Sequence, residues 1–302
     1  MNLRRLLTTP LSATGWVLED GMVAAVRHDR KDGFLCAAGE VPAEAVETGP
    51  MGLQKVEPAL LAAALRPVQE AVVGGRRPAV LVPCRWARMH LLELDEVPRR
   101  RAELDEVVRW RLKKLVPVRP GDLRLDLVPF KGEGDRWRVL CLSGMERAWE
   151  SLEEAFEAVG AQPALLTPAA FALSAALPGE HAVEVAVHLE TGMLTVLAWR
   201  GGQLVLAHTK LLPPGEVAWD GVERELRTVA LYLREKLGAG DDPGVLALAG
   251  PGLALAELEG RLGALGGRPI VPPPSPPPCP ELPGEAAEAL RAVAALHGGT
   301  FR

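Results

Sequence analysis

Two predicted β-hairpins, one near the start of each half of the chain, constrain the fold more than any other feature. The first lies within Val17–Val26, where two short apolar runs flank Asp20-Gly21, a dipeptide typical of two-residue hairpin turns. The second joins Val183–Leu189 to Met193–Trp199 through the turn Glu190-Thr191-Gly192. Each hairpin is followed by segments of helical and strand periodicity. The sequence therefore predicts two α/β halves built on a similar plan.

The remaining elements follow from apolar periodicity and from Gly and Pro breakers. Further strands are expected at 33–39, 79–82, 122–128, 136–142, 203–209 and 245–249. Helices are expected at 56–73, 104–115, 146–159, 222–237, 253–265 and 285–296. The prolines within 271–280 predict an extended, stiff linker before the last helix.

Composition bounds the class of protein. The chain has 302 residues, 48% hydrophobic and 24% charged, with a mean hydropathy of +0.10, which is typical of globular proteins. The net charge is −5, so no overall positive field favours nucleic acid or anionic lipid. No run approaches the about 18 to 20 apolar residues that a membrane-spanning helix needs. We expect neither a membrane span nor a secretory signal.

Cysteine and histidine spacing predicts neither disulfides nor metal. Cys36, Cys84, Cys141 and Cys279 are scattered without paired spacing, and the six histidines stand apart from them. We therefore expect no structural disulfide, no metal site and a reducing, cytoplasmic compartment.

A family resemblance is clearest in Val97–Val118 and in the strand that follows it. The pairs Glu103-Leu104, Val116-Pro117 and Leu125-Asp126 make this region similar to the inserted subdomain of the PilM family of type IV pilus assembly proteins. PilM proteins belong to the actin-like ATPase superfamily, whose halves also open with β-hairpins. Matching segments continue in order at Leu140–Glu146, Gly160–Pro163, Thr167–Leu173 and Leu246–Gly252. The cytoplasmic domain of the type II secretion protein GspL has a similar layout.

The resemblance implies an α/β, actin-like (ribonuclease H-like) fold with two lobes and an inserted α/β subdomain. It assigns 1–48, 164–180 and 285–302 to the first lobe, 49–163 to the inserted subdomain, 181–270 to the second lobe and 271–284 to the Pro-rich linker.

The resemblance also identifies candidate nucleotide-binding positions. Two facing hairpin turns grip phosphate in this superfamily, and a later glycine turn contacts adenosine. The corresponding residues here are Asp20, Gly21, Glu190, Thr191, Gly192, Gly250 and Gly252. Met22-Val23 stands where serines are expected, and His188 stands near an expected aspartate. We therefore expect no cofactor and a degenerate ATPase without enzymatic activity, with binding of ATP and Mg²⁺ as the alternative.

The implied function is a cytoplasmic scaffold at the inner membrane. In PilM, a groove next to the inserted subdomain holds the cytoplasmic tail of the bitopic membrane protein PilN. The expected partners are a PilN-like tail and other pilus platform proteins, with no nucleic acid and with membrane contact only through the partner. Arginine and tryptophan anchors dominate binding interfaces. The candidate partner-binding residues are Val82, Arg85, Trp86, Val107, Trp110 and Arg111, with Arg111 expected on the apolar stripe of its helix.

Alternative functions from other classes stay open at this point. An active ATPase or small-molecule kinase would use the cleft between the two halves, and it would need intact phosphate loops. A filament-forming, actin-like cell-division protein is a further alternative. The basic run Arg99–Arg101 fits a solvated helix face, or a site for an acidic tail or lipid headgroup.

Overall fold

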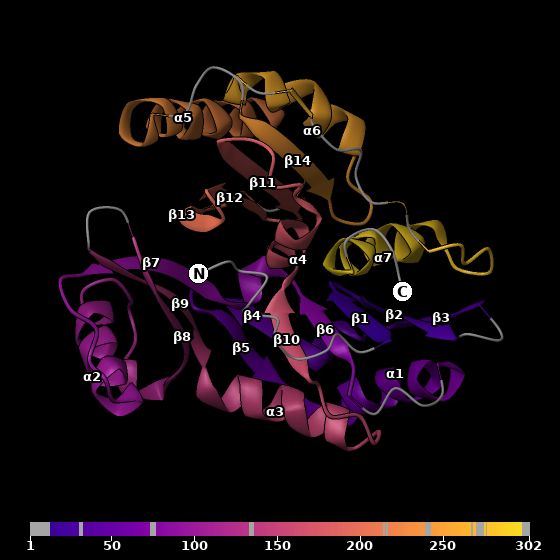
Figure 1. Ribbon diagram of the computed structural model, residues 1–302. Helices are drawn as coiled ribbons and strands as arrows, with labels where there is room; N and C mark the ends of the chain where they lie inside the picture. The colour runs from indigo at the N-terminus through magenta and orange to yellow at the C-terminus, as the bar shows by residue number, and fades with distance from the viewer. Residues whose placement is uncertain are drawn as a thin grey trace.

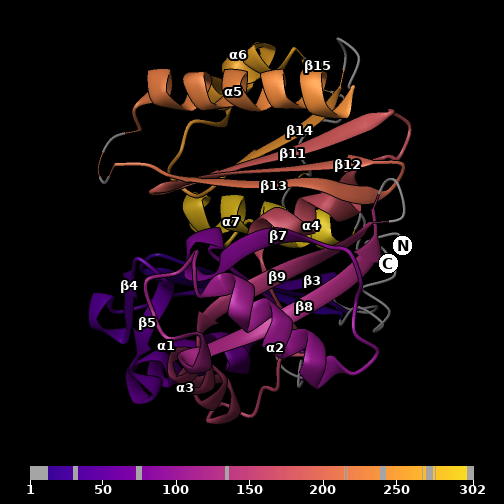
Figure 2. The same ribbon diagram turned by 90° about the vertical axis from the view of Figure 1, so that its left-hand side faces the viewer.

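The computed structural model arranges two β-sheets and their helices in alternating layers (Figure 1). Helices α1 and α3 lie outside the first sheet, α4 and α7 lie between the two sheets, and α5 and α6 cover the second sheet. Figure 2 shows the same order of layers from the side. The structure describes residues 13–29, 33–72, 77–132, 136–213, 215, 217–238, 243–266, 268–269, 275 and 277–297.

The first sheet has five strands in the order β10-β6-β1-β2-β3. These are β1 (Thr14–Glu19), β2 (Met22–Asp29), β3 (Gly33–Glu40), β6 (Ala79–Val82) and β10 (Leu165–Pro168). Strands β1, β2 and β3 are antiparallel neighbours, whereas β6 and β10 run parallel to β1. Both faces of β1 and β6 are buried, which explains their continuous apolar runs.

Two pairs of helices sandwich this sheet. On the outer face lie α1 (Pro58–Ala71) and α3 (Glu146–Glu157), and on the inner face lie α4 (Ala169–Ala176) and α7 (Gly284–Leu296). Helix α7 approaches β1 so closely that a Cβ atom at Gly15 would lie 2.2 Å from the Val293 Cγ1 atom. The alanines of α4 and α7 allow this close packing between the sheets.

The second sheet has the order β13-β12-β11-β14-β15. Its strands are β11 (Val183–Glu190), β12 (Met193–Arg200), β13 (Gln203–Leu211), β14 (Gly244–Ala249) and β15 (Arg268–Pro269). Its outer face packs against α5 (Trp219–Leu237), α6 (Leu255–Arg261) and the 3-10 turn η6 (Leu262–Leu265). Every residue of β11 is buried, including the polar Glu184, His188 and Glu190. Buried polar side chains require hydrogen-bond partners, so we expect the three polar residues of β11 to contact other polar groups.

A third sheet, β7-β9-β8, lies beside the first lobe. It contains β7 (Arg88–Leu94), β8 (Leu123–Lys131) and β9 (Trp137–Met145). Side chains alternate along β8, so Leu123 and Leu127 pack against α2 (Arg101–Leu112) on one face. Asp126 and Val128 face the opposite side. The remaining elements are the hairpin β4 (Val46–Gly49) and β5 (Gly52–Val56) and the 3-10 turns η2 (Ala43–Ala45), η3 (Cys84–Trp86) and η4 (Pro120–Asp122).

The structure corrects three sequence-based expectations. The range 49–163 is too large for the inserted subdomain, because β6 pairs with β1, and both α1 and α3 cover the first sheet. The separate sheet and its helix occupy only 88–145. Arg111 is exposed rather than on the buried stripe of α2, which consists of Leu104, Val108 and Leu112.

The third correction concerns the cysteines. A disulfide joins Cys36 of β3 to Cys279, which precedes α7. The two residues are 243 positions apart, so their spacing carried no signal of the pairing. Of the linker expected at 271–284, residues 271–274 and 276 lie outside the described residues. Among the helices that the structure describes, none is both long enough and apolar enough to cross a bilayer.

Candidate functional site

The first candidate site is the junction between the two lobes, where the predicted phosphate loops lie. The β1–β2 turn is formed by Asp20-Gly21, and the β11–β12 turn is formed by Thr191-Gly192. Between them lies η3, which follows β6. Arg85 of η3 connects the turns, because its guanidinium pairs with Asp20 and its backbone N–H donates to the Glu190 carboxylate. The structure thus brings Asp20 and Glu190 into one network.

Glu190 is held by the backbone of η3. Its Oε2 atom accepts a hydrogen bond from the Cys84 N–H at 2.8 Å, and its Oε1 atom accepts one from the Arg85 N–H at 2.7 Å. Only 2% of the residue is exposed. Both carboxylate oxygens are therefore directed at the chain's own amides, which are the kind of group that binds phosphate oxygens in nucleotide sites.

His188 and Cys84 complete this buried cluster. His188 and Glu190 are two positions apart on β11, so their side chains lie on the same face. The His188 Nδ1 atom lies 3.5 Å from the Cys84 Sγ atom and 3.7 Å from the Glu190 Oε2 atom. The Cys84 Sγ atom also accepts the backbone N–H of Ala170 at 3.3 Å. The cluster joins one residue of the first lobe to two residues of the second.

Burial shifts the protonation equilibria of the junction. It raises the pKa of Glu19 to about 8, and the nearby Glu190 carboxylate adds to this shift. It also raises the pKa of Glu190 to about 7, against the opposing effect of the amide hydrogen bonds. Burial lowers the pKa of His188 to about 4 and raises the pKa of Cys84 well above its ordinary value. Each of these groups is therefore biased toward its neutral form.

The glycines assigned to adenosine contact lie at the end of β14. The Gly250 N–H donates to the Leu189 carbonyl at 2.7 Å, and a Cβ atom at Gly250 would lie 3.6 Å from the Glu190 Cα atom. A Cβ atom at Gly252 would lie 3.6 Å from the Glu285 Oε1 atom of α7. Gly250 is therefore a neighbour of the second loop, whereas Gly252 faces an acidic side chain.

The second candidate site is a groove between the third sheet and the first lobe. Two adjoining hollows, of about 200 Å³ and about 130 Å³, share Asp126, Leu142 and Leu166 in their walls. Strands β8 and β9 supply one wall, and β10 supplies the other. Trp149 of α3 and Phe171 of α4 close the two ends. We refer to these continuous hollows as the groove.

Two strand edges border the groove. Strand β10 is the last strand of the first sheet, and β8 is the last strand of the third sheet. Each pairs along one side with a described strand, β6 and β9 respectively. An edge strand presents backbone N–H and C=O groups to which an extended segment can add. The groove therefore offers both apolar walls and backbone pairing.

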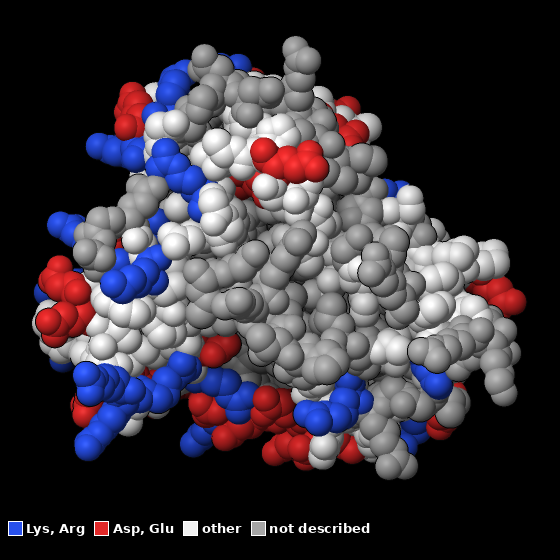
Figure 3. All heavy atoms as spheres, viewed as in Figure 1, with Lys and Arg blue, Asp and Glu red and all other residues white. Residues whose placement is uncertain are grey.

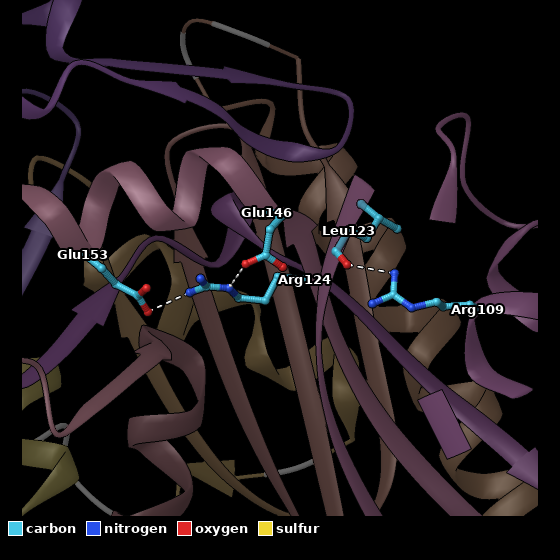
Figure 4. A network of polar contacts seen from close by, with 5 residues as sticks. All are labelled: Arg109, Leu123, Arg124, Glu146 and Glu153. Carbon is cyan, nitrogen blue, oxygen red and sulfur yellow. Dashed lines mark hydrogen bonds and ion pairs between the residues drawn. The ribbon is translucent and has the colours of Figure 1, made fainter. Parts of the chain in front are cut away.

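Charged side chains fix the rim of the groove. Arg124 donates from Nε to Glu146 at 2.8 Å and from Nη1 to Glu153 at 2.6 Å (Figure 4). Asp126 is paired with Arg101 at 3.6 Å but keeps 74% of its side chain exposed. Farther along β8, Arg109 of α2 donates to the Leu123 carbonyl at 2.9 Å, which fixes α2 on the other face of the sheet. The groove rim is thus rigid and net acidic.

Comparisons with known proteins identify the fold. No protein-family model matches the chain, and no curated protein sequence matches it. A chain of the solved PilM–PilN type IV pilus biogenesis complex matches with a TM-score of 0.68 and 18% identity, over 96% of this chain and 98% of that one. A Bacteroides thetaiotaomicron protein with an actin-like ATPase fold matches with a TM-score of 0.50 and 11% identity, over 83% and 86%. The chain has an actin-like fold.

A third solved structure also matches the chain. The cytoplasmic domain of EpsL, an inner membrane component of the Vibrio cholerae type II secretion system, matches with a TM-score of 0.49 and 13% identity, over 93% of this chain and 94% of that one. The predicted actin-like, two-lobed α/β fold is confirmed by the two matches with higher scores. In this fold the two hairpin turns do face one inter-lobe junction.

The structure separates the predicted partner-binding residues. Val82 and Trp86 are core residues, fully or almost fully buried. Arg85 is engaged in the junction. Val107, Trp110 and Arg111 belong to α2, which packs on the face of the third sheet that is turned away from the groove. None of the six lines the groove.

Trp110 forms part of a separate exposed surface. It is 62% exposed, and the Lys114 ammonium lies 5.4 Å from its ring centroid. Figure 3 shows lysine and arginine atoms gathered at the lower left, over α2. This arrangement fits the expected solvated, basic helix face.

Sequence reasoning missed the groove residues Arg124, Asp126, Leu142 and Leu166, although one signal was present. Along 123–128, leucines alternate with Arg124 and Asp126, which indicates a strand with two different faces. It also missed the contact between Cys84 and His188. The only local signal for that contact is the spacing of His188 and Glu190, which places both side chains on one face of a buried strand.

Proposed function

We propose that this chain is a scaffold of a type IV pilus or related inner-membrane assembly platform, and that its groove binds the cytoplasmic tail of a PilN-like protein. The observation that carries the proposal is the open groove between the edges of β8 and β10. The likeness to a chain of the PilM–PilN complex, over nearly the full length of both chains, supports it. Association with the membrane would then occur through the partner, and other platform proteins would join the same assembly.

The groove defines the chemistry of the segment that it would bind. Leu140, Leu142 and Leu166 supply apolar contacts, so the segment should carry apolar side chains on one face. Arg124, Asp126, the two glutamates bound to Arg124 and the Arg101 that pairs with Asp126 leave a net charge of −1 at the rim, so a basic residue should follow the apolar ones. Pairing with β8 or β10 requires the segment to be extended.

We further propose that the inter-lobe junction holds no nucleotide. The fit to Mg²⁺ and ATP is poor, because the η3 amides are bonded to Glu190 and Asp20 is paired with Arg85. Glu19 and Glu190 place acidic side chains, biased toward their neutral forms, where phosphate would need cations, and no phosphate-binding lysine is found among the described residues of either loop. The scaffold would therefore act without an ATPase cycle.

The test is a calorimetric titration of the full chain with a synthetic peptide of the PilN-like tail from the same organism. Leu142→Glu and Leu166→Glu place charges in the groove at half-buried positions, and we expect each to weaken binding at least about tenfold. Leu231→Glu is the matched control, because Leu231 is an exposed leucine of α5 in the other lobe. Equal affinities for all four proteins, each shown to be folded by circular dichroism, would contradict the proposal.

A further inference from the structure

The cluster of Cys84, His188 and Glu190 has the composition of a transition-metal site. Each residue offers one ligand atom, and all three atoms lie within 4.8 Å of one another. Thiolate, imidazole and carboxylate are the three side-chain ligands that zinc binds in proteins. All three residues are buried, so the ligand atoms are screened from bulk water.

Two of the three separations are close to the edges of a zinc tetrahedron, and the third is no more than 4.8 Å. With Zn–S at about 2.3 Å and Zn–N and Zn–O at about 2.0–2.2 Å, neighbouring ligand atoms lie about 3.4–3.6 Å apart. The observed distances are 3.5 Å from the His188 Nδ1 atom to the Cys84 Sγ atom and 3.7 Å from the same nitrogen to the Glu190 Oε2 atom. An ion could therefore bind His188 together with either neighbour almost without rearrangement, and small rotations of the Cys84 and Glu190 side chains would close the third edge.

Backbone amides orient two of the three side chains of the cluster. The Ala170 N–H donates to the Cys84 Sγ atom, and the amides of Cys84 and Arg85 donate to the Glu190 carboxylate. Hydrogen bonds of this kind orient metal ligands, and a bound cation would supply the charge that stabilises the thiolate and the carboxylate. The backbone therefore orients Cys84 and Glu190, whereas His188 is held by its position on the buried strand β11.

We propose that Cys84, His188 and Glu190 form a zinc site that joins the two lobes, with a water molecule as the fourth ligand. Zinc fits better than magnesium, because magnesium selects oxygen ligands in octahedral geometry and avoids sulfur. The ion would connect η3 of the first lobe to β11 of the second. This site is independent of the groove and of any partner that binds there.

The test is a Zn²⁺ titration of the full chain after chelator treatment, with a chromophoric chelator as competitor and air excluded. We expect one Zn²⁺ per chain and a higher unfolding temperature with the metal. Cys84→Ser and His188→Gln should each lower the affinity at least about a hundredfold, since even outer-shell partners are worth about 10- to 100-fold. Cys141→Ser, which alters the other buried free cysteine, should bind like the wild type.

A spectroscopic measurement keeps the test valid if a variant fails to fold. Co²⁺ added to the wild-type chain should produce a sulfur-to-cobalt charge-transfer band, which Zn²⁺ abolishes by displacement. A folded wild-type chain that takes up neither ion would overturn the proposal and leave a plain S–H···N hydrogen bond. Wild-type affinity in folded Cys84→Ser would overturn it equally.

Discussion

The inter-lobe junction and the groove are both boundaries between separately folded layers, but their polar groups are used differently. In the junction, Glu190 accepts two η3 amides and Arg85 pairs with Asp20, so the chain satisfies its own donors and acceptors. In the groove, β10 and β8 are the last described strands of their sheets, and Leu142 and Leu166 between them are only half-buried. The polar groups of the junction are therefore used within the chain, whereas the groove is the surface at which we propose that a partner binds.

This difference supports the proposal that this actin-like fold acts as a scaffold. A nucleotide site needs free amides and a cation where the phosphates lie. Here the Glu190 carboxylate already accepts hydrogen bonds from the amides of Cys84 and Arg85. The groove keeps apolar walls and two strands at sheet edges, of which β8 already has its Leu123 and Leu127 carbonyls bonded to Arg109 and Arg101.

Removing the Glu190 carboxylate should have the largest effect on the free energy of unfolding. Glu190→Ala leaves the buried N–H groups of Cys84 and Arg85 without their acceptor, and each such loss costs about 1–3 kcal/mol. We expect the free energy of unfolding, measured by urea denaturation, to fall by about 3 kcal/mol. Glu190→Gln keeps an acceptor oxygen and should cost about 1 kcal/mol. An unchanged stability of Glu190→Ala would show that the junction is open to solvent.

Adding a methyl group at Gly144, beside the groove, should have the next largest effect on stability and should also weaken peptide binding. A Cβ atom at Gly144 would lie 2.0 Å from the Trp149 Nε1 atom, so Gly144→Ala must displace the indole that closes the groove. We expect a loss of about 2 kcal/mol in urea denaturation, as for other overpacked sites, and weaker peptide binding. Gly121→Ala meets no atom within 4 Å and is the control. Peptide affinity that survives in Gly144→Ala would place the binding site elsewhere.

Altering the charge of the rim should have a smaller effect. Arg124→Ala leaves Glu146 and Glu153 unpaired at half-exposed positions, so stability should fall by about 1 kcal/mol or less. Because the rim becomes more acidic, a peptide with a basic residue should bind more tightly at low salt, and the gain should diminish as salt is added. Weaker binding of that peptide, measured at two salt concentrations, would contradict the assigned polarity of the groove.

The smallest effect is expected on the outer face of α2. Trp110 is largely exposed and lies across the third sheet from the groove, so Trp110→Ala should change stability by less than about 0.5 kcal/mol. Peptide affinity should be unchanged in the same calorimetric titration. A clear loss of affinity would restore α2 as the partner-binding surface that the sequence first suggested.

Local patterns predicted the elements well, because turns and apolar periodicity are local. Asp20-Gly21 and Thr191-Gly192 both form the turns expected of them, with Gly21 and Gly192 at positive φ. The helix expected at 56–73 is observed at Pro58–Ala71. The pairing of β6 with β1 was missed, since it depends on contacts between distant segments that periodicity does not encode.

The candidate sites were harder to predict for the same reason. Cys84 and His188 are 104 positions apart, and the groove combines β8, β9 and β10 with two helices. The error at Arg111 was different in kind. Arg111 is seven residues after Leu104, so helical spacing alone places it beside the buried stripe of Leu104, Val108 and Leu112. The side chain is nevertheless exposed, and that outcome depends on how α2 is set against the third sheet.

The most direct test of the account is amide hydrogen exchange of the full chain, with and without the PilN-like tail peptide and, separately, with ATP and Mg²⁺. We predict slower exchange along β8 and β10 with the peptide, and no change in η3 or the β11–β12 turn with the nucleotide. Protection of η3 and that turn by ATP, with β8 and β10 unaffected by the peptide, would contradict the central claim that binding resides in the groove.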